Sequence, residues 1–286
     1  MGRGRASLCD RPARCESLPV LDRDEMRVIT VPFALALASQ AISTVPDLSH
    51  DFVGVVGTFV LLNGRTNEYV RYNPTRADAR FSPCSTFKIP HTAILLESGI
   101  APDADYEVAY DPAYKQPSQW ARDFTLKTAF QLSAAWYYQV LGRRAGMRVE
   151  QRFLHQFAYG NEDTRGGLDK MGEPFWLDGT LRISANEQVE FLRRFYEGRL
   201  GLSDRTSQIT KQIMVAEDRP MWRLSAKTGA CHPNGEDTTN WYVGYVEKTD
   251  GAYYFALEMA DKDFGRAYTE RIPKARAILT ELGVLR

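Results

Sequence analysis

Strand-like segments lie at both ends of this chain, and this arrangement restricts the fold more than any other sequence feature. The segments rich in strand-forming residues are 53–62, 67–73, 221–229, 240–248 and 252–259. The first of them ends at Asn63-Gly64, a dipeptide typical of hairpin turns. Because strands from both ends are expected to share one sheet, we predict one interwoven unit and not two successive domains.

Helical periodicity fills the middle of the chain. Between residues 100 and 200, apolar residues recur at spacings of three and four, and Ser184 with Glu187 forms the pattern of a capping box. A further helix is expected to end at Gly99, and a last one to cover roughly 266–282. The predicted fold class is therefore α/β in the broad sense (α+β): an antiparallel sheet flanked by helices, with an inserted helical region.

A leader sequence is expected before the folded domain. Residues 1–25 are polar and of mixed charge, whereas Met26-Arg27 is followed by an apolar stretch and the cleavage-type sequence Ala36-Leu37-Ala38. We interpret residues 26–41 as a secretory signal peptide, residues 1–25 as an upstream misreading of the frame, and residues 42–286 as a single domain. The alternative is a buried helix rich in Ala, Leu and Val. Export predicts a periplasmic location.

The charge balance and the histidines argue against several kinds of partner. Lys plus Arg and Asp plus Glu number 36 each, and no basic cluster favours nucleic acid. No apolar run of the mature chain is long enough to span a membrane. The four histidines lack metal-ligand spacing: His50, His91, His155 and His232. We expect a small-molecule partner and no metal; the sequence leaves open a monomer or a homodimer.

Ser85 and Lys88 stand one helical turn apart in the stretch SPCSTFKIPH. The residues after Lys88 are mostly apolar, so its side chain is expected to lose hydration and its pKa to fall towards that of a neutral amine. A neutral amine beside a hydroxyl is a base beside a nucleophile. The alternative is a helix start with a capping serine and a solvated lysine.

Two further pieces follow along the chain. Lys227-Thr228-Gly229 ends a predicted strand, where a cation and a hydroxyl would bind a carboxylate and the glycine would let a substrate approach closely. Ser133 lies on or between helices. The alternatives are an exposed cation at a strand edge and a serine that bonds back to its own helix.

The order S-x-x-K, serine and K-T-G resembles that of the penicillin-recognising serine enzymes, the β-lactamases and penicillin-binding transpeptidases. Four stretches narrow the resemblance to the class D serine β-lactamases, or oxacillinases. They are Ser85-Thr86-Phe87-Lys88-Ile89-Pro90, Asp123-x-Thr125-Leu126, Tyr159-Gly160-Asn161 and Phe175-Trp176-Leu177-Asp178-Gly179. The resemblance extends over about residues 50–286 and implies a β-lactamase/transpeptidase-like catalytic domain that hydrolyses β-lactam antibiotics.

The resemblance assigns a modification to Lys88. In class D enzymes the lysine of this motif is carboxylated by carbon dioxide, giving N6-carboxylysine, and acts as general base for attack by Ser85 and for hydrolysis of the acyl-enzyme. Trp176 would hold the carboxylated group with its indole N–H. No cofactor is implied besides the carbon dioxide or bicarbonate that carboxylates Lys88.

The resemblance also assigns the remaining site residues. Ser133 would relay a proton to the leaving nitrogen, and the backbone N–H groups of Ser85 and Ala230 would bind the oxyanion. Lys227 and Thr228 would help to hold the substrate carboxylate. An arginine on or after the last strand completes that site in the family; Arg266 is our choice, and Arg271 is the alternative.

Cysteines flank two of the motifs. Cys84 precedes the serine and Cys231 lies two residues past Gly229, whereas Cys9 and Cys15 fall in the segment expected to be absent from the mature protein. Some class A β-lactamases have a disulfide at these offsets, so the resemblance implies a Cys84–Cys231 bond. The alternative is two buried free thiols.

Three departures from the family pattern bear on substrate range. Ala135 stands where the family has a valine, Ala230 is smaller than its usual counterpart, and Tyr110 stands where many members have a tryptophan. Two alternative functions remain open at this stage. One is a β-lactam sensor or penicillin-binding module that stays acylated, and the other is a transpeptidase or carboxypeptidase acting on peptidoglycan.

Overall fold

This computed structural model describes residues 46–168, 173–233, 237–262 and 264–286. The predicted leader, residues 1–41, lies outside the described residues. Within the described part of the chain, none of the helices has the length and apolar character needed to cross a membrane.

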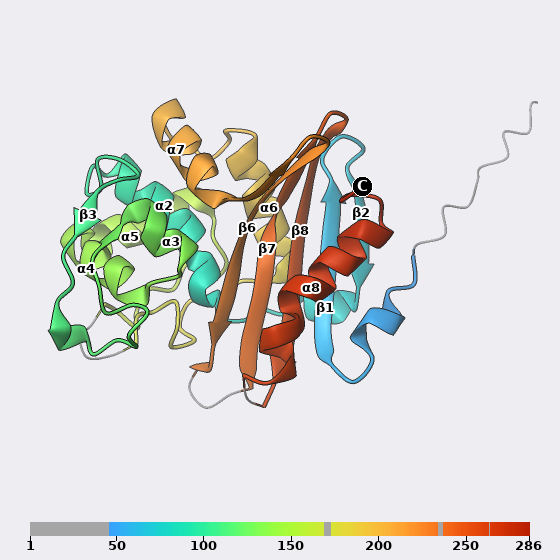
Figure 1. Ribbon diagram of the computed structural model, residues 1–286, viewed down its shortest axis with the longest axis horizontal. Coiled ribbons are helices and arrows are strands. Elements are labelled where there is room, and N and C mark those ends of the chain that lie inside the picture. The colour runs from blue at the N-terminus through green and yellow to red at the C-terminus, as the bar shows by residue number, and fades with distance from the viewer. Residues whose placement is uncertain (1–45, 169–172, 234–236, 263) are drawn as a thin grey trace, which may run out of the picture. The chain divides into compact units, whose positions relative to one another are not determined.

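One antiparallel sheet contains strands from both ends of the chain, as predicted (Figure 1). Its strands are β1 (Val56–Asn63), β2 (Glu68–Tyr72), β5 (Val215–Arg219), β6 (Trp222–Cys231), β7 (Thr238–Lys248) and β8 (Gly251–Asp261). Their order across the sheet is β2-β1-β8-β7-β6-β5. The sequence did not predict β5, because this edge strand is mostly polar and partly exposed and lacks an apolar alternation.

The turn at Asn63-Gly64 closes the hairpin between β1 and β2, as predicted. Asn63 pairs with Glu68 across the hairpin. The side-chain oxygen of Asn63 accepts hydrogen bonds from the backbone N–H groups of Arg65 at 3.0 Å and Thr66 at 3.3 Å. Asparagine thereby satisfies the turn's own backbone, which is why it is common at such positions.

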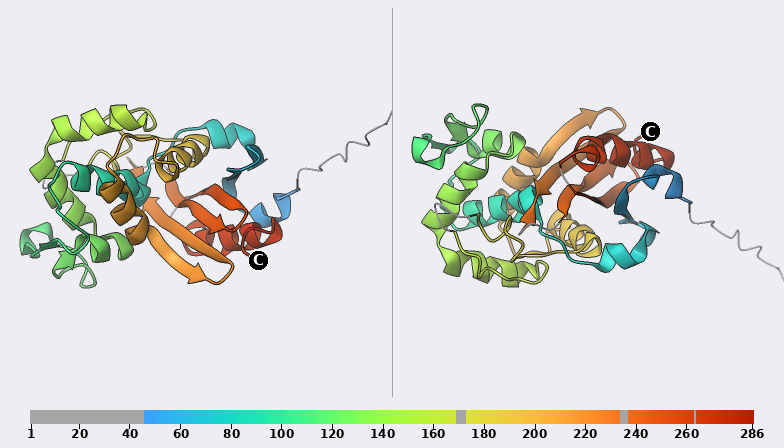
Figure 2. Two further views of the ribbon diagram at one scale, coloured as in Figure 1. Left: turned by 90° about the horizontal axis from the view of Figure 1, so that it is seen from above. Right: turned by 90° about the horizontal axis from the view of Figure 1, so that it is seen from below.

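Helices cover both faces of the sheet (Figure 2). On one face, α8 (Arg266–Glu281) packs against β7 and β8, and on the other, α6 (Ala185–Tyr196) packs against β8 and β1. Ser184 caps α6 in a reciprocal capping box with Glu187, as the sequence predicted. The buried apolar residues of α8, among them Ile278 and Leu279, belong to the core between this helix and the sheet.

The inserted helical region lies beside the β6 side of the sheet (Figure 1). Its helices are η2 (Cys84–Phe87), α2 (Lys88–Glu97), α3 (Leu126–Gln131), α4 (Ala135–Ala145), α5 (Met147–Phe157) and α7 (Asp204–Met214). The helix α2 is buried along nearly its whole length, since the first nine of its ten residues are buried. The core of the inserted region therefore surrounds the helix that begins at Lys88.

Ser133, predicted to lie on or between helices, lies between α3 and α4 and has a φ of 58°. One expectation for this region was wrong. Residues 100–125 are mostly not helical; they contain β3 (Glu107–Val108), η3 (Pro112–Tyr114) and β4 (Phe124–Thr125). Prolines and short polar residues in this stretch favour turns over a helix. Besides these, α1 (Pro74–Asp78) follows β2, and η1 (Ser49–Phe52) precedes β1.

Candidate active site

Ser85 and Lys88 meet where η2 continues into α2. The Nζ atom of Lys88 donates a hydrogen bond to Oγ of Ser85 at 2.9 Å. Only 1% of Lys88 is exposed, whereas Ser85 is partly exposed. Burial, and then the positive charge of Lys227, lower the pKa of Lys88 well below its ordinary value. A neutral amine therefore lies beside an accessible hydroxyl, and the solvated-lysine alternative is wrong.

Gly229 lets β6 approach η2. A Cβ atom at position 229 would lie 2.9 Å from the carbonyl oxygen of Pro83 and 3.0 Å from Cγ2 of Thr86. We expected this glycine to make room for the substrate; the structure shows that it makes room for the segment that carries Ser85.

A disulfide joins the same two elements. Cys84 and Cys231 are bonded, and their Cα atoms lie 5.5 Å apart. The pairing implied by the resemblance is therefore present, and the free-thiol alternative is wrong. Cys84 immediately precedes Ser85, so the bond ties the segment that carries the hydroxyl directly to the end of β6.

Lys227 and Ser133 connect the sheet to the inserted region. The Nζ atom of Lys227 donates to Oγ of Ser133 at 3.0 Å and to the carbonyl oxygen of Thr228 at 3.1 Å. Burial, followed by the charge of Arg271, lowers the pKa of Lys227 from 10.5 to about 7. Lys227 is therefore close to its neutral form near neutral pH, and its amine lies within hydrogen-bond distance of the Ser133 hydroxyl.

A pocket of about 310 Å³ opens at this junction. Its lining consists of Ser85, Trp120, Ser133, Thr228, Ala230, Phe264, Tyr268 and Arg271. The pocket thus brings two serine hydroxyls and a guanidinium together in a space of small-molecule size.

The arginine that lines this pocket is Arg271, the alternative, and not Arg266, our first choice. Arg266 is half-exposed and binds elsewhere: its Nε donates to Glu270 at 2.6 Å and its guanidinium reaches the carbonyl oxygen of Val53 at 3.3 Å. Arg271 is buried and lines the pocket beside Thr228.

Aromatic residues at the pocket were not predicted from the sequence. Trp120 lies in the loop between η3 and β4, and its Nε1 donates to the carbonyl oxygen of Leu132 at 2.9 Å, which anchors the indole at the loop carrying Ser133. Phe264 and Tyr268 line the pocket from the start of α8. Tyr110, which we compared with a family tryptophan, instead contacts Trp136, with ring centroids 5.2 Å apart.

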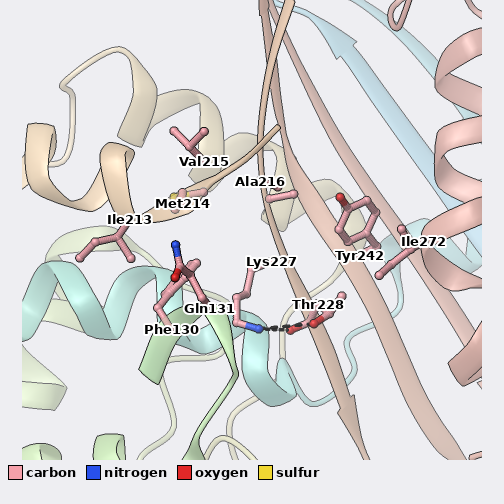
Figure 3. Close-up of a pocket in the computed structure, with 11 residues that line it drawn as sticks. Phe130, Gln131, Ile213, Met214, Val215, Ala216, Lys227, Thr228, Tyr242 and Ile272 are labelled. Carbon is pink, nitrogen blue, oxygen red and sulfur yellow. Dashed lines mark hydrogen bonds between the residues drawn. The ribbon is translucent and has the colours of Figure 1, made fainter. Parts of the chain in front are cut away.

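A second cavity of about 400 Å³ meets the first at Thr228. Figure 3 shows that Lys227 and Thr228, which both line this second cavity, are hydrogen-bonded to each other. Its other lining residues are Phe130, Gln131, Ile213, Met214, Val215, Ala216, Ala226, Tyr242 and Ile272. Thr228 thus lines both cavities, and the second one is also lined by Val215 and Ala216 at the start of β5.

Trp176 offers a donor that nothing in the described part of the chain accepts. Its side chain is fully buried and its ring stacks on Phe87, with centroids 5.3 Å apart. Nε1 of Trp176 has no hydrogen-bond partner among the described residues. A buried N–H without an acceptor is costly, so this atom marks a place for an acceptor group. A carboxyl group on Lys88 would fit that donor chemistry, and Phe87, on which the indole stacks, directly precedes Lys88 in the chain.

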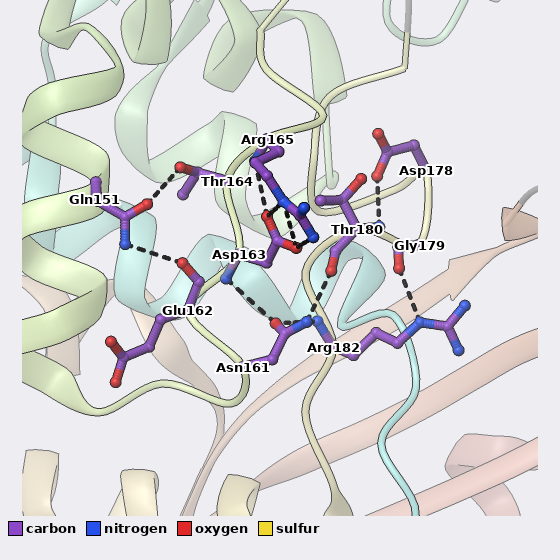
Figure 4. Close-up of polar contacts among 10 residues, drawn as sticks. All are labelled: Gln151, Asn161, Glu162, Asp163, Thr164, Arg165, Asp178, Gly179, Thr180 and Arg182. Carbon is purple, nitrogen blue, oxygen red and sulfur yellow. Dashed lines mark hydrogen bonds and ion pairs between the residues drawn. The ribbon is translucent and has the colours of Figure 1, made fainter.

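The Y-G-N stretch supports the segment that carries Trp176 (Figure 4). Asn161 Nδ2 donates to the carbonyl oxygen of Thr180 at 2.9 Å, and Asn161 Oδ1 accepts from the backbone N–H of Arg182 at 2.8 Å. Gly160 has a φ of 58°, and a Cβ there would collide with the Arg182 carbonyl. From the other side, Ser82 Oγ donates to the Trp176 carbonyl at 2.9 Å.

One group of side chains outside the pocket has the donor atoms for a metal. His50, Asp51 and Glu281 approach one another where η1 meets the end of α8, a proximity that the sequence did not reveal. His50 and Glu281 are exposed, and exposed groups of this kind are common without a bound ion.

Sequence comparison finds relatives of the same architecture. The penicillin binding protein transpeptidase domain family matches residues 57–280. Beta-lactamase OXA-48 of Klebsiella pneumoniae is 38% identical over 203 residues, which cover 71% of this chain and 75% of that protein. Beta-lactamase OXA-10 of Pseudomonas aeruginosa is 38% identical over 207 residues, 72% of this chain and 76% of the relative. The regulatory protein BlaR1 of Bacillus licheniformis is 34% identical over 203 residues, 71% of this chain but 33% of BlaR1.

Solved structures agree with these relationships. The class D β-lactamase YbXI from Nostoc superposes with a TM-score of 0.77 at 31% identity, covering 83% of this chain and 98% of that structure. FUS-1 (OXA-85), a class D β-lactamase from Fusobacterium nucleatum subsp. polymorphum, superposes with a TM-score of 0.77 at 32% identity. The match covers 82% of this chain and 95% of that structure.

Proposed function

The chain belongs to the class D β-lactamases and is a β-lactam hydrolase, and we propose that it works through an acyl-enzyme on Ser85 with carboxylated Lys88 as the general base. The observation that carries this proposal is the buried Nζ of Lys88, which lies 2.9 Å from the Ser85 hydroxyl. Burial keeps the amine neutral, and only a neutral amine can react with carbon dioxide.

Lys88 and Trp176 would hold the carboxyl group. Carboxylation supplies an anionic oxygen base in a site that otherwise has only an amine. The unpartnered indole N–H of Trp176 would donate to that group, and Phe87 holds the indole by stacking on it. Both side chains are buried, so the base is kept out of bulk water.

Ser85 is the nucleophile in this proposal, and β6 supplies the groups that bind the substrate. The backbone N–H groups of Ser85 and Ala230, both pocket residues, would stabilise the oxyanion of the opening ring. Thr228, Lys227 and Arg271 would bind the substrate carboxylate through their hydroxyl and cationic groups.

Ser133 would return a proton to the leaving nitrogen. Its hydroxyl accepts a hydrogen bond from Lys227, whose pKa of about 7 lets this lysine replace the proton that Ser133 gives up. The position of Ser133 in the pocket, on the loop between α3 and α4, is consistent with this transfer.

Nitrocefin hydrolysis with and without added bicarbonate tests the proposal. We expect continuous turnover that rises with bicarbonate. The match to BlaR1 favours one alternative, a protein that is acylated and stays acylated. A burst of one equivalent followed by no turnover, with a stable adduct detected by mass spectrometry, would support that alternative and refute the proposed cycle.

We also propose export to a periplasm through the segment at 26–41. The bond between Cys84 and Cys231 supports this, because structural disulfides persist in oxidising compartments. N-terminal sequencing of the protein from a periplasmic fraction should give a start shortly after Ala38 or Ala41. A start at Met1 or recovery only from the cytoplasm would contradict it.

A further inference from the structure

The inserted region buries a histidine and a glutamate that the proposed reaction does not use. Nε2 of His91, on α2, lies 2.9 Å from Oε1 of Glu150, on α5, and both side chains are fully buried. Removing an ionised group from water costs roughly several kcal/mol, and only a well-paired partner offsets that desolvation penalty. A hydrophobic pair would fill the same space, so this pair calls for a specific explanation.

His91 belongs to the aromatic wall around Lys88. It follows Lys88 by three residues on α2, a spacing that puts two side chains on the same helix face. Its ring centroid lies 5.1 Å from that of Trp176 in an edge-on arrangement and 5.3 Å from that of Tyr138. The Tyr138 ring in turn lies 5.4 Å from Nζ of Lys88. The imidazole therefore supports the same indole whose N–H lacks an acceptor.

A third helix is shaped to accommodate this ring. A Cβ atom on Gly142, inside α4, would lie 3.2 Å from both Cε1 and Nε2 of His91. Glycine inside a helix costs about 1 kcal/mol relative to alanine. Gly142 therefore leaves room for the His91 ring beside α4, and Glu150 lies against the ring from α5. The 2.9 Å approach to Glu150 is a charge contact without hydrogen-bond geometry, because neither ring nitrogen of His91 has a hydrogen-bond partner among the described residues.

From these contacts we infer that His91 and Glu150 are positioning residues, which fix the Trp176 indole and thereby set how firmly the carboxyl group is held on Lys88. This inference rests on the proposed function, since it concerns the carboxylated form of Lys88. Neither residue lines the pocket of Ser85, so neither is expected to touch the substrate.

The experiment compares E150Q and H91N with the unaltered protein. Carboxylation is followed by ¹³C NMR after addition of ¹³C-bicarbonate, and the bicarbonate dependence of nitrocefin turnover is measured in parallel. In both variants, we expect half-maximal carboxylation of Lys88 to need about tenfold more bicarbonate than in the unaltered protein. Loss of a residue that orients a binding side chain typically weakens binding by about this factor. At saturating bicarbonate, kcat should return close to that of the unaltered protein.

E258Q is a matched control. Glu258, on β8, is fully buried and pairs with Arg76, whose Nε and Nη2 lie 2.6 and 2.9 Å from its carboxylate oxygens. Breaking this pair should lower the melting temperature without changing the half-saturating bicarbonate. If E150Q and H91N behave like E258Q, the pair is purely structural and the inference is wrong.

A third variant, G142A, provides a test if E150Q or H91N does not fold. It retains both ionisable groups, and its methyl group would lie 3.2 Å from the His91 ring and 3.3 Å from Cδ1 of Leu168, so we expect a smaller change in the same direction. An unchanged bicarbonate dependence in folded G142A overturns the inference. A failure of the proposed function is distinguishable, because the unaltered protein itself would then show neither a carbamate signal nor any effect of bicarbonate.

Discussion

The side-chain nitrogen of Lys227 lies 3.0 Å from the hydroxyl oxygen of Ser133, although these residues come from the sheet and from the inserted helical region. Lys227 also acts on Lys88, because its positive charge contributes to the lowered pKa of that lysine. Arg271 in turn lowers the pKa of Lys227. The charges at the site therefore act in sequence: the charge of Arg271 lowers the pKa of Lys227, and the charge of Lys227 lowers the pKa of Lys88.

Replacing Lys227 by methionine should shift the pH dependence of Lys88 carboxylation upwards. The charge of Lys227 favours the neutral form of Lys88; without it the pKa of Lys88 rises, the amine stays protonated to a higher pH, and carbon dioxide reacts only above that pH. The ¹³C NMR signal of the carbamate, followed against pH, measures this directly. In the unaltered protein the signal should disappear as the pH falls through the pKa of Lys88.

Lys211 provides the control for this experiment. Its amine donates to the Tyr196 carbonyl at 2.8 Å, burial lowers its pKa, and its charge is not among the causes of the Lys88 shift. The same substitution at Lys211 should leave the carbamate titration unchanged. A downward shift in the Lys227→Met protein would contradict the proposed coupling.

Lys88→Ala should lower turnover by about 10²- to 10⁴-fold, the contribution typical of a general base. Ser85 remains, so a β-lactam adduct can still form slowly, and it should then persist. Intact-protein mass spectrometry after mixing with a penicillin should show the added mass on Lys88→Ala for hours, whereas Ser85→Ala should show none. Bicarbonate should no longer stimulate the residual activity, and stimulation would mean that carbon dioxide acts elsewhere.

Much of the fold followed from local sequence patterns. The hairpin at Asn63-Gly64 and the capping box at Ser184 are formed by neighbouring residues, so the sequence contains the whole signal. The S-x-x-K spacing likewise places Lys88 beside Ser85, since both belong to one continuous turn of chain.

The features that were missed depend on tertiary packing. Arg266 and Arg271 lie five residues apart, which turns them about 140° from each other around a helix, and only the seating of α8 on the sheet decides which one faces the pocket. For Ser133 the sequence left open a place on or between helices, because the apolar spacing continues through it; its left-handed backbone and its contact with Lys227 are visible only in the folded chain. Trp120 sits in a loop, where periodicity gives no information.

Arg271→Ala should reduce kcat/KM by about 10- to 100-fold, because a hydrogen bond to a charged group contributes roughly 1.5–3 kcal/mol. The loss should appear mainly in KM, since the guanidinium binds the carboxylate and lies away from the reacting bond. Arg266→Ala is the matched control on the same helix, and its kinetics should be within about twofold of the unaltered protein. If Arg271→Ala and Arg266→Ala have equal effects on kcat/KM, the proposal that Arg271 binds the substrate carboxylate is wrong.

Loss of the disulfide should lower stability more than activity. The bond joins positions 147 residues apart, and removal of such a link typically reduces the free energy of unfolding by about 2–4 kcal/mol. The close contact of Gly229 with Pro83 still holds η2 against β6, so the double change Cys84→Ala, Cys231→Ala should keep kcat/KM within about tenfold. Guanidinium unfolding and nitrocefin kinetics measure the two effects separately. Dithiothreitol should destabilise the unaltered protein by a similar amount and leave the double variant unaffected; if it leaves both unaffected, the bond does not contribute to stability.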